Sequence, residues 1–357
     1  MSLSTKTQLD PIKMSRSLLK WYDRSNRDMP WRRNPLPWWV WVSEIMLQQT
    51  RVDSVIGYFN RFIERYPSPQ SLAESSLDEL MGYWAGLGYY ARARNLHKAA
   101  NQVVDLHGGR VPNDPEKFRA LAGVGRYTCA AVQSIAFGEP MAVLDGNVIR
   151  VLSRLERIDK NPKLATVKDQ FWTLADALLD HERAGDFNQA MMELGATVCT
   201  PKKPKCLLCP LMDMCRARQE IDPETLPIRV PKKKRPVIQM VAGLSTAEDD
   251  SIWLVRRPEK GLLGGLWSLP MVQGDTHDAL ETLNLNPQDA CQTVRHGFTH
   301  QIWDISTYPC EGKPICANFD EVRAFKVSEI KTLGLGGPSL KALRVCGIDL
   351  PRRRGAG

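Results

Sequence analysis

Hydrophobic positions follow helical spacing along most of the chain. Between about residues 14 and 220, apolar residues recur every three or four positions, as in the run Val148, Val151, Leu152 and Leu155. This spacing places apolar side chains on one face of a helix. Prolines and glycines interrupt the runs at intervals. The pattern therefore predicts a series of separate helices that share a core.

The pattern changes near residue 226. The segment LPIRVPKKKRP (226–236) combines prolines with adjacent basic residues, which is typical of a linker. Beyond it, β-branched and aromatic residues predict strands at 237–245, 251–257, 300–308 and 322–327. One helix is expected near 277–285. We expect a mainly α region over residues 1–225 and an α+β region over residues 237–350.

Charge and composition narrow the class of protein. The 357 residues contain 48 Lys and Arg against 40 Asp and Glu, a formal net charge of +8. An excess of cations suits a polyanionic partner such as DNA, because cations that neutralise phosphates release counterions. A basic protein without such a partner is the alternative.

No stretch approaches the roughly 20 apolar residues of a membrane span, and the N-terminus lacks the apolar core of a signal peptide. We expect a cytoplasmic protein.

Four of the nine cysteines form the pattern C-x6-C-x2-C-x5-C: Cys199, Cys206, Cys209 and Cys215. An odd number of cysteines without a secretion signal argues against a disulfide framework. Structural zinc sites usually pair two short C-x2-C hairpins, whereas this cluster has one short spacing with a longer arm on each side. The pattern favours a [4Fe–4S] cluster held by four thiolates. Zinc is the first alternative, and a metal-free group of structural cysteines is the second.

The segment FRALAGVGRYTCAAVQSIAFG (118–138) predicts a helix, a tight turn and a second helix. Gly123 and Gly125 allow a turn that side chains would obstruct. Free N–H groups at the start of the second helix can bind a phosphate without reading base sequence. An ordinary connector between two helices is the alternative.

Glu44 lies in the segment WVSEIMLQQT (41–50), which is apolar on almost every side. A carboxylate in such a helix is poorly solvated, so its pKa should rise. A neutral glutamic acid can serve as a general acid near pH 7. The alternative is a glutamate that forms an ion pair with an arginine such as Arg51 or Arg92.

Asp145 precedes Gly146 and Asn147 at the predicted start of a helix. The positive end of the helix dipole favours an ionised carboxylate there, although a plain N-cap is the alternative. A protonated Glu44 opposite an ionised Asp145 would suit cleavage of a glycosidic bond. One carboxyl protonates the leaving group and the other stabilises the oxocarbenium-like sugar.

Together these motifs resemble the helix–hairpin–helix DNA glycosylases, a superfamily that includes endonuclease III. The sequence is similar above all to the MutY-type adenine DNA glycosylases, densely so over about residues 20–220. The matching segments are MPWR (29–32), WVSEIMLQQT (41–50), GLGYYARARNLHKAA (86–100), LAGVGRYT (121–128), LDGNV (144–148), FNQAMMELGA (187–196) and CTPKKPKCLLCP (199–210). The resemblance implies a helix–hairpin–helix glycosylase fold with an iron–sulfur loop. It also implies an enzyme that removes adenine from DNA.

The resemblance also implies roles for single residues. Glu44 would protonate the adenine base at N7, and Asp145 would stabilise or trap the sugar cation. Tyr127 and Asn147 would orient these groups. An adenine pocket is implied at Arg27, Arg32 and Gln189. The base must leave the duplex before its sugar bond can be reached, and Leu47, Gln48, Gln49 and Tyr89 match residues that enter the base stack and support the extruded state. Gly123 and Gly125 belong to the predicted phosphate-binding turn and are the other expected DNA contacts.

Tyr127 separates two branches of the superfamily. Endonuclease III-like members carry a lysine at this position, which forms a Schiff base with the sugar and cuts the strand. A phenol cannot form an imine, so we predict a monofunctional glycosylase. Two further departures are Ala122, in place of a proline before the hairpin, and Ile149, in place of a lysine.

The C-terminal region is similar to the Nudix-like domain with which MutY-type enzymes recognise 8-oxoguanine opposite the adenine. The matching segments are GLLGGLWSLP (261–270) and HGFTHQIWDI (296–305). The resemblance implies that Phe298, Thr299 and His300 probe the opposite base; a strand edge with an incidental histidine is the alternative. Nudix hydrolases hold Mg²⁺ with clustered glutamates, and the segment after Pro270 has no such cluster, so we expect no hydrolase activity.

Three classes of function compete. The first is a base-excision glycosylase that acts as a monomer on double-stranded DNA with A·8-oxoguanine or A·G pairs, in the cytoplasm at the nucleoid and not at a membrane. The second is a bifunctional glycosylase–lyase for damaged pyrimidines, which Tyr127 disfavours. The third is a non-catalytic cluster protein that binds DNA or senses redox state, which Glu44 and Asp145 disfavour.

Overall fold

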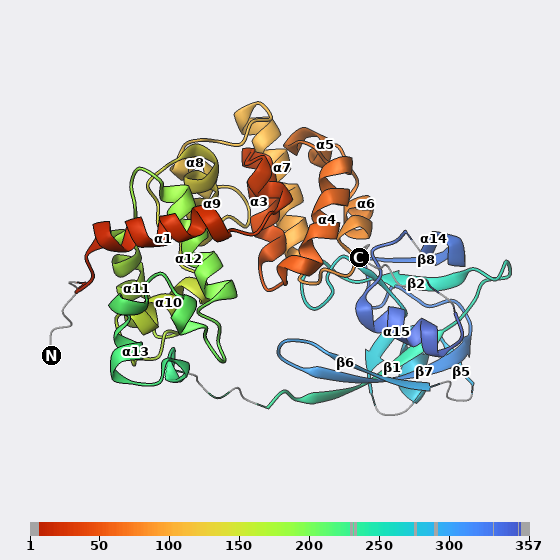
Figure 1. Cartoon of the computed structure of the whole chain (residues 1–357). Coiled ribbons are helices and arrows are strands. Elements are labelled where there is room, and N and C mark those ends of the chain that lie inside the picture. The colour runs from red at the N-terminus through yellow and green to blue at the C-terminus, as the bar shows by residue number, and fades with distance from the viewer. Residues whose placement is uncertain are drawn as a thin grey trace. The chain divides into compact units, whose positions relative to one another are not determined.

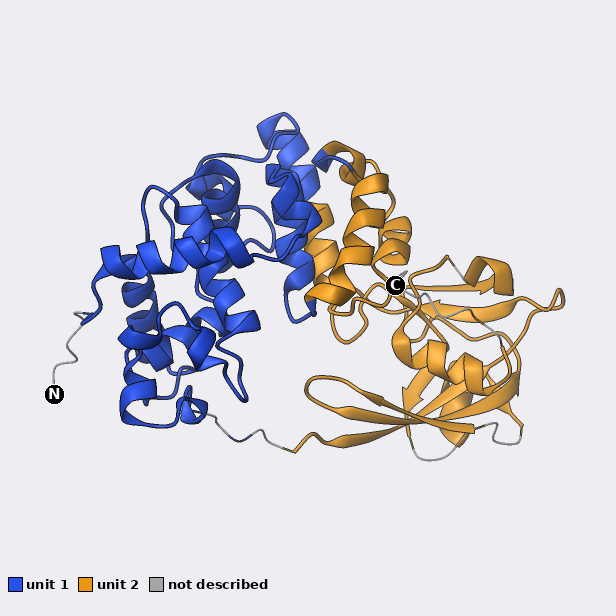
Figure 2. Cartoon of the chain, viewed as in Figure 1, with its two compact units in different colours: residues 1–51, 67–69, 99–232 blue, residues 52–66, 70–98, 233–357 orange. Residues whose placement is uncertain are grey.

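The chain forms two compact units that are not contiguous in sequence (Figures 1 and 2). In this computed structural model, residues 7–228, 231, 234–274, 277–288, 292–330, 332–348 and 350 are described. Unit 1 comprises residues 1–51, 67–69 and 99–232, and unit 2 comprises residues 52–66, 70–98 and 233–357. Helical segments between residues 52 and 98 thus group with the C-terminal strands. The predicted linker 226–236 lies partly outside the described residues, and the domain division at 225–237 stays a prediction.

Unit 1 is helical. Its elements are α1 (Pro11–Ser25), α2 (Pro30–Arg33), α3 (Pro37–Leu47), α8 (Pro115–Arg119), α9 (Arg126–Phe137), α10 (Gly146–Leu155), α11 (Ala165–Leu178), α12 (Ala184–Thr197), α13 (Arg216–Glu220), η1 (Cys206–Leu208), η2 (Met212–Met214) and η3 (Pro223–Thr225). Four of the α-helices in this unit begin with a proline, which suits the first turn because its missing N–H would have no partner there. Asp10 and Asp114 cap α1 and α8 with their side chains.

The core of unit 1 forms where α1, α9, α10, α11 and α12 pack together. Val148, Val151, Leu152 and Leu155, which the helical spacing placed on one face, are all buried there. That prediction is confirmed. Among the described residues, no helix is long and apolar enough to cross a membrane.

Unit 2 combines helices with two small sheets. Its helices are α4 (Val52–Arg65), α6 (Leu77–Trp84), η4 (His277–Leu283), α14 (Val327–Ile330) and α15 (Gly337–Val345), and α5 (Pro69–Ala73) and α7 (Ala91–His107) belong partly to each unit. Its strands are β1 (Val237–Leu244), β2 (Ile252–Arg256), β3 (Trp267–Ser268), β4 (Met271–Gln273), β5 (Asn286–Pro287), β6 (Gln292–Gly297), β7 (Ile302–Glu311) and β8 (Glu321–Phe325).

The larger sheet is built around β1 and β7, which run parallel with Val237 opposite Ile302. β4 pairs with β1, and β5 and β6 pair with β7, all antiparallel. The second sheet has the order β3-β2-β8. A mainly α region followed by an α+β region agrees with the predicted fold class, and all four predicted strands are present.

Several elements of unit 2 differ from the sequence prediction: the short strands β3, β4 and β5 and the short helix α14 were not predicted, and three longer elements also differ. The expected helix at 277–285 is the short 3-10 helix η4. Strand β6 and helix α15 were not predicted. β6 lacks a buried alternation because polar and charged side chains occupy most of its positions. α15 begins with Gly337 and Pro338, residues that usually mark loops.

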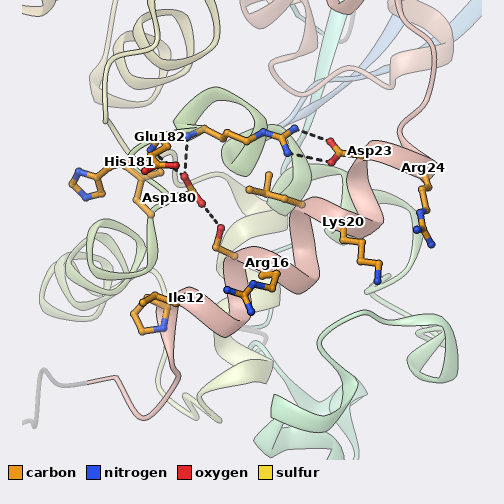
Figure 3. Close-up of a pocket in the computed structure, with 13 residues that line it drawn as sticks. Ile12, Arg16, Lys20, Asp23, Arg24, Asp180, His181 and Glu182 are labelled. Carbon is orange, nitrogen blue, oxygen red and sulfur yellow. Dashed lines mark hydrogen bonds and ion pairs between the residues drawn. The ribbon is translucent and has the colours of Figure 1, made fainter.

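A surface groove of about 730 Å³ lies between α1 and the turn at residues 179–183 (Figure 3). Arg183 forms an ion pair with Asp23 of α1 at 2.7 Å, and Ser15 of α1 donates a hydrogen bond to Asp180. These contacts attach the first helix to the start of α12. None of the predicted site residues lines this groove.

Candidate active site

Glu44 lies on α3 where this helix packs against α9. The residue is 5% exposed, and the hydroxyl of Tyr127 on α9 donates a hydrogen bond to its Oε2 atom at 2.7 Å. The same hydroxyl lies 3.3 Å from the sulfur of Met192. Of the two partners that the sequence left open for Glu44, neither arginine takes this position; a neutral phenol does.

The environment of Glu44 favours its protonated form. Burial raises the pKa of Glu44 to about 7, the hydrogen bond from Tyr127 and the charge of Arg32 oppose the rise, and the neighbouring carboxylate of Asp145 adds to it. The predicted direction is therefore confirmed. Burial and the two carboxyl groups also raise the pKa of Tyr127 well above its usual range, so Tyr127 stays a hydrogen-bond donor.

Asp145 caps the N-terminus of α10. Its Oδ1 atom accepts the N–H of Val148 at 2.7 Å, and its Oδ2 atom accepts the side-chain amide of Asn147 at 2.9 Å. The prediction that the helix terminus keeps the pKa of Asp145 low is wrong in direction. Burial raises the pKa above its ordinary value, and the hydrogen bonds from Val148 and Asn147 only partly oppose that rise.

Asn147 is held between Asp145 and a residue that the sequence analysis missed. Arg150 donates hydrogen bonds to Oδ1 of Asn147 at 2.7 Å, to the carbonyl of Cys199 at 2.7 Å and to the carbonyl of Gly195 at 2.6 Å. A Cβ atom at Gly195 would lie 2.6 Å from Cβ of Asn147. Glycine is needed at 195 because α12 and α10 approach each other this closely. The spacing of Arg150, five residues after Asp145 on α10, was the available signal.

The three residues predicted for an adenine pocket meet around Glu193 of α12. Arg27 and Arg32 both form ion pairs with Glu193, at 2.5 and 2.9 Å, and Nε of Arg32 donates to the side chain of Gln189 at 3.1 Å. Burial raises the pKa of Glu193, but the two arginines outweigh it and hold the pKa below its ordinary value. The sequence analysis missed Glu193, although it follows Gln189 by one helical turn.

The four clustered cysteines converge on one small site of unit 1. All four line a cavity of about 20 Å³ together with Arg154 of α10. Burial raises the pKa of the Cys209 thiol to about 12, and the other three cysteines add to that rise through their charges. Among the described residues, no three metal-binding side chains stand in the arrangement of a single bound ion.

The surroundings of Arg154 indicate whether the four cysteines could hold an anionic cluster. The residue is 1% exposed, its Nη1 atom lies 3.3 Å from the sulfur of Cys199, and Nη2 has no hydrogen-bond partner among the described residues. A buried arginine needs a nearby negative charge. Four thiolates around an iron–sulfur cube supply that charge and weak sulfur acceptors. The residues present therefore fit the predicted cofactor.

The predicted hairpin joins α8 to α9 through residues 120–125. Gly123 has φ +76°, in the left-handed region where glycine is free of strain. Gly125 is the N-cap of α9, no side chain caps that terminus, and a Cβ there would meet nothing within 4 Å. The N–H of Ala122 donates to the side chain of Gln102 at 2.8 Å, a hydrogen bond that a proline could not make.

The residues predicted to distort DNA lie just beyond α3 and before α7. Leu47 ends α3, and Gln48 donates to the hydroxyl of Thr128 at 3.5 Å. Gln49 is exposed with φ +59°, and Tyr89 is 44% exposed with φ +49°. Both residues adopt a left-handed backbone conformation, which is strained for residues other than glycine. Each therefore projects from a turn whose shape the surrounding fold imposes.

The recognition loop, which we define as Phe298–His300, lies at the tip of the β6–β7 hairpin. The N–H of Phe298 donates to the carbonyl of Gln301 at 2.8 Å and closes the turn. Thr299 and His300 are exposed, whereas Phe298 is half-buried. Within unit 2, the hydroxyl groups of Thr299 and Tyr89 lie 3.0 Å apart. Residues 210 positions apart in the sequence thus share a hydrogen bond.

Three family models match the chain. The HhH-GPD superfamily of base excision DNA repair proteins matches residues 42–176, and a NUDIX domain matches residues 241–345. The iron–sulfur binding domain of endonuclease III matches residues 199–215. These matches confirm the predicted fold class, a helix–hairpin–helix glycosylase with an iron–sulfur loop followed by a Nudix-like domain. They also confirm a [4Fe–4S] cluster, as opposed to zinc, as the cofactor.

Curated relatives and solved structures agree with these models. The adenine DNA glycosylase of Homo sapiens is 40% identical over 74% of this chain and 58% of that protein. The adenine DNA glycosylase of Buchnera aphidicola subsp. Acyrthosiphon pisum is 34% identical over 82% of this chain and 85% of that protein. The structure of a thermostable thymine-DNA glycosylase covers 58% of this chain and 96% of its own, with 30% identity and a TM-score of 0.54.

The chain spans 58% of the length of the human relative and 61% of that of the Rattus norvegicus relative, so it matches a part of those proteins. It spans 85% of the Buchnera relative, and the similarity covers 82% of this chain. By this similarity, and by the glycosylase, Nudix and iron–sulfur models that match its segments, the chain belongs to the adenine DNA glycosylase family.

Proposed function

We propose that this chain is a monofunctional DNA glycosylase that hydrolyses the N-glycosidic bond of adenine opposite 8-oxoguanine or guanine. The observation that carries this proposal is the buried carboxyl of Glu44, whose pKa is about 7, next to Tyr127 and near Asp145. A carboxyl with that pKa is protonated in about half of the molecules at neutral pH, and the protonated form can give its proton to a leaving base.

Glu44 acts as the general acid in this proposal. Its proton moves to N7 of the extruded adenine, and the electrons of the bond between C1′ and N9 pass to the base. Tyr127 holds the carboxyl in place through the 2.7 Å hydrogen bond and cannot form an imine with the sugar. Water then adds to C1′ and gives a proton to the carboxylate that Glu44 has become, so the products are free adenine and an abasic sugar and Glu44 is protonated again.

Asp145 stabilises the positive charge that develops on the sugar. Its carboxylate is oriented by the amide of Asn147 and the N–H of Val148. Burial raises its pKa before the substrate binds, but a cation beside it favours the ionised form again. A charge that is fixed in place beforehand stabilises a transition state at little cost of reorganisation. Arg27, Arg32 and Gln189, gathered around Glu193, form the proposed adenine pocket.

The remaining sites are assigned to DNA and to the cofactor. Gly123 and Gly125 place the uncapped N-terminus of α9 where it can bind a phosphate. Leu47, Gln48, Gln49 and Tyr89 support the extruded state, and Phe298, Thr299 and His300 read the opposite base. Cys199, Cys206, Cys209 and Cys215 would hold the cluster, and the bound cluster would tie their loop together. A monomer in the cytoplasm and no Nudix hydrolysis remain predictions.

The test is cleavage of a duplex that holds one A·8-oxoguanine pair. We expect strand breaks only after hot alkali, because removal of adenine leaves an abasic site in an intact strand. Strand breaks without alkali would show a glycosylase–lyase. An adenine that stays intact, at enzyme concentrations that saturate the duplex in a binding assay, would overturn the proposal.

A further inference from the structure

Three aromatic rings pack at the base of the recognition loop, one pair tilted and the other edge-to-face. His296 of β6 and Trp303 of β7 are directly opposite each other in the sheet register. The ring of Phe298 lies between them, with its centroid 4.7 Å from the centroid of each. Trp303 is 4% exposed and belongs to the core of the C-terminal sheet. The loop residue Phe298 is therefore attached to that core through two rings.

The imidazole of His296 packs against the backbone of Gly337 as well as against Phe298. A Cβ atom built on Gly337, the first residue of α15, would lie 2.9 Å from Cε1 of His296. The ring thus fills the space that a side chain at residue 337 would take. Its Nδ1 atom is buried and has no hydrogen-bond partner among the described residues. Burial and the charge of Lys341 lower the pKa of His296 to about 4, so the ring is neutral at pH 7.

We propose that His296 is a positioning residue for discrimination of the opposite base: its ring, seated on the backbone of Gly337, holds Phe298 against Trp303. The inference rests on the proposed role of Phe298 as the residue that probes that base. Residues at the tip of an exposed hairpin lose conformational freedom when they bind. A ring that is already packed between two others has lost much of that freedom beforehand.

In this geometry, His296 contributes packing and not charge. A neutral imidazole with one unpaired buried nitrogen contributes a ring face and no ion pair. Phenylalanine offers the same ring face, and it removes a buried polar atom that has no described partner. We therefore expect His296→Phe to keep discrimination, while His296→Ala leaves a gap beneath Phe298.

The experiment measures single-turnover cleavage of A·8-oxoguanine and A·G duplexes by the full chain. The readout is the ratio of the two rate constants. We expect His296→Ala to lower this ratio by about two- to tenfold, the effect of losing one aromatic pair. The rate on A·8-oxoguanine should fall more than the rate on A·G, and His296→Phe should restore the ratio.

Gly337→Ala tests the contact from the other side. Its new Cβ would displace the His296 ring, so the ratio should fall as it does for His296→Ala. In the double variant the alanine at 296 leaves room for that Cβ, so the second substitution should add nothing. Additive losses, or equal losses on both duplexes for His296→Ala, would mean that His296 only supports the fold.

Phe298→Ala separates the failure of this inference from that of the proposed function. If Phe298→Ala keeps the ratio, the proposed role of the recognition loop is wrong and the inference falls with it. If Phe298→Ala lowers the ratio while His296→Ala keeps it, the loop reads the base without the help of His296. A fall in both, with rescue by His296→Phe, supports the inference.

Discussion

Glu44 of unit 1 and Thr299 of unit 2 are both polar side chains with a proposed part in the reaction, and they have opposite surroundings. Glu44 is 5% exposed and accepts a hydrogen bond from Tyr127, whereas Thr299 is exposed at a hairpin tip and shares a hydrogen bond with Tyr89. Proton transfer near pH 7 needs a shifted pKa, which burial provides. Recognition of a base needs a surface that DNA can reach.

The contrast predicts two kinds of variant. Substitutions around Glu44 and Asp145 should lower cleavage equally for every opposite base, because they change the bond-breaking step. Substitutions in the recognition loop should change the ratio between opposite bases and leave the bond-breaking step intact. A variant of one region that behaves like the other would break the distinction.

The largest effect is expected for Glu44→Gln. Glutamine keeps the size and the hydrogen-bond acceptor but has no proton to give, so single-turnover cleavage should fall by about 10³-fold on both A·8-oxoguanine and A·G. Duplex affinity in a gel-shift assay should stay within about threefold, less than 1 kcal/mol. Substantial cleavage by this variant would remove Glu44 from the acid role.

The same substitution should stabilise the protein at high pH. The pKa of Glu44 is about 7 in the folded protein and about 4.5 in the unfolded chain, so folding favours the protonated form. The stability that this proton provides is present below pH 4.5 and is lost as the pH rises through 7. Glutamine avoids that loss. At pH 8 we expect Glu44→Gln to be more stable by about 3 kcal/mol in denaturant unfolding, and at pH 4 by almost nothing.

Gly195→Ala should damage the site through packing. The added Cβ would lie 2.6 Å from Cβ and 3.1 Å from the Cα of Asn147, so α10 and α12 must move apart. We expect a loss of about 1–3 kcal/mol of stability, the usual cost of overpacking, and slower cleavage on both duplexes. Gly146→Ala is the matched control for stability, because a Cβ there meets nothing within 4 Å. Equal unfolding temperatures for the two variants would contradict the close approach.

Tyr127→Phe should change the pH profile more than the maximal rate. The hydrogen bond from Tyr127 lowers the pKa of Glu44, so its removal should raise that pKa further above 7. A general acid acts while it is protonated, so the alkaline limb of the cleavage profile should move to higher pH. The measurement is the single-turnover rate between pH 5 and 9. A limb that moves to lower pH would show that Tyr127 does not stabilise the ionised carboxylate.

The smallest effect is expected for Thr299→Val, which keeps the shape of the side chain and removes its hydroxyl. The ratio of cleavage on A·8-oxoguanine to cleavage on A·G should fall by about two- to tenfold, as for one lost hydrogen bond. Tyr89→Phe removes the partner hydroxyl of the same bond. If the two substitutions act through that bond, the double variant should be no worse than either single variant.

Local sequence patterns were sufficient for the elements whose cause is local. The spacing of Val148, Val151, Leu152 and Leu155 predicted the buried face of α10, because helical periodicity alone puts those side chains together. The two glycines predicted the turn before α9, and the C-x6-C-x2-C-x5-C spacing predicted a cluster that the family models confirm. Each of these depends on residues within one or two turns of one another.

The sequence patterns could not predict contacts between segments that lie far apart in the chain and meet only in the folded protein. The sequence by itself determined that Glu44 is buried and that Asp145 begins a helix. That the two residues act together is a prediction from the family resemblance. Only the tertiary structure decided that a phenol partners Glu44 and that burial outweighs the helix terminus at Asp145. It also showed that Arg27 and Arg32 meet over Glu193. The reason is physical: a pKa or an ion pair depends on charges within a few ångströms in space, whatever their separation along the chain.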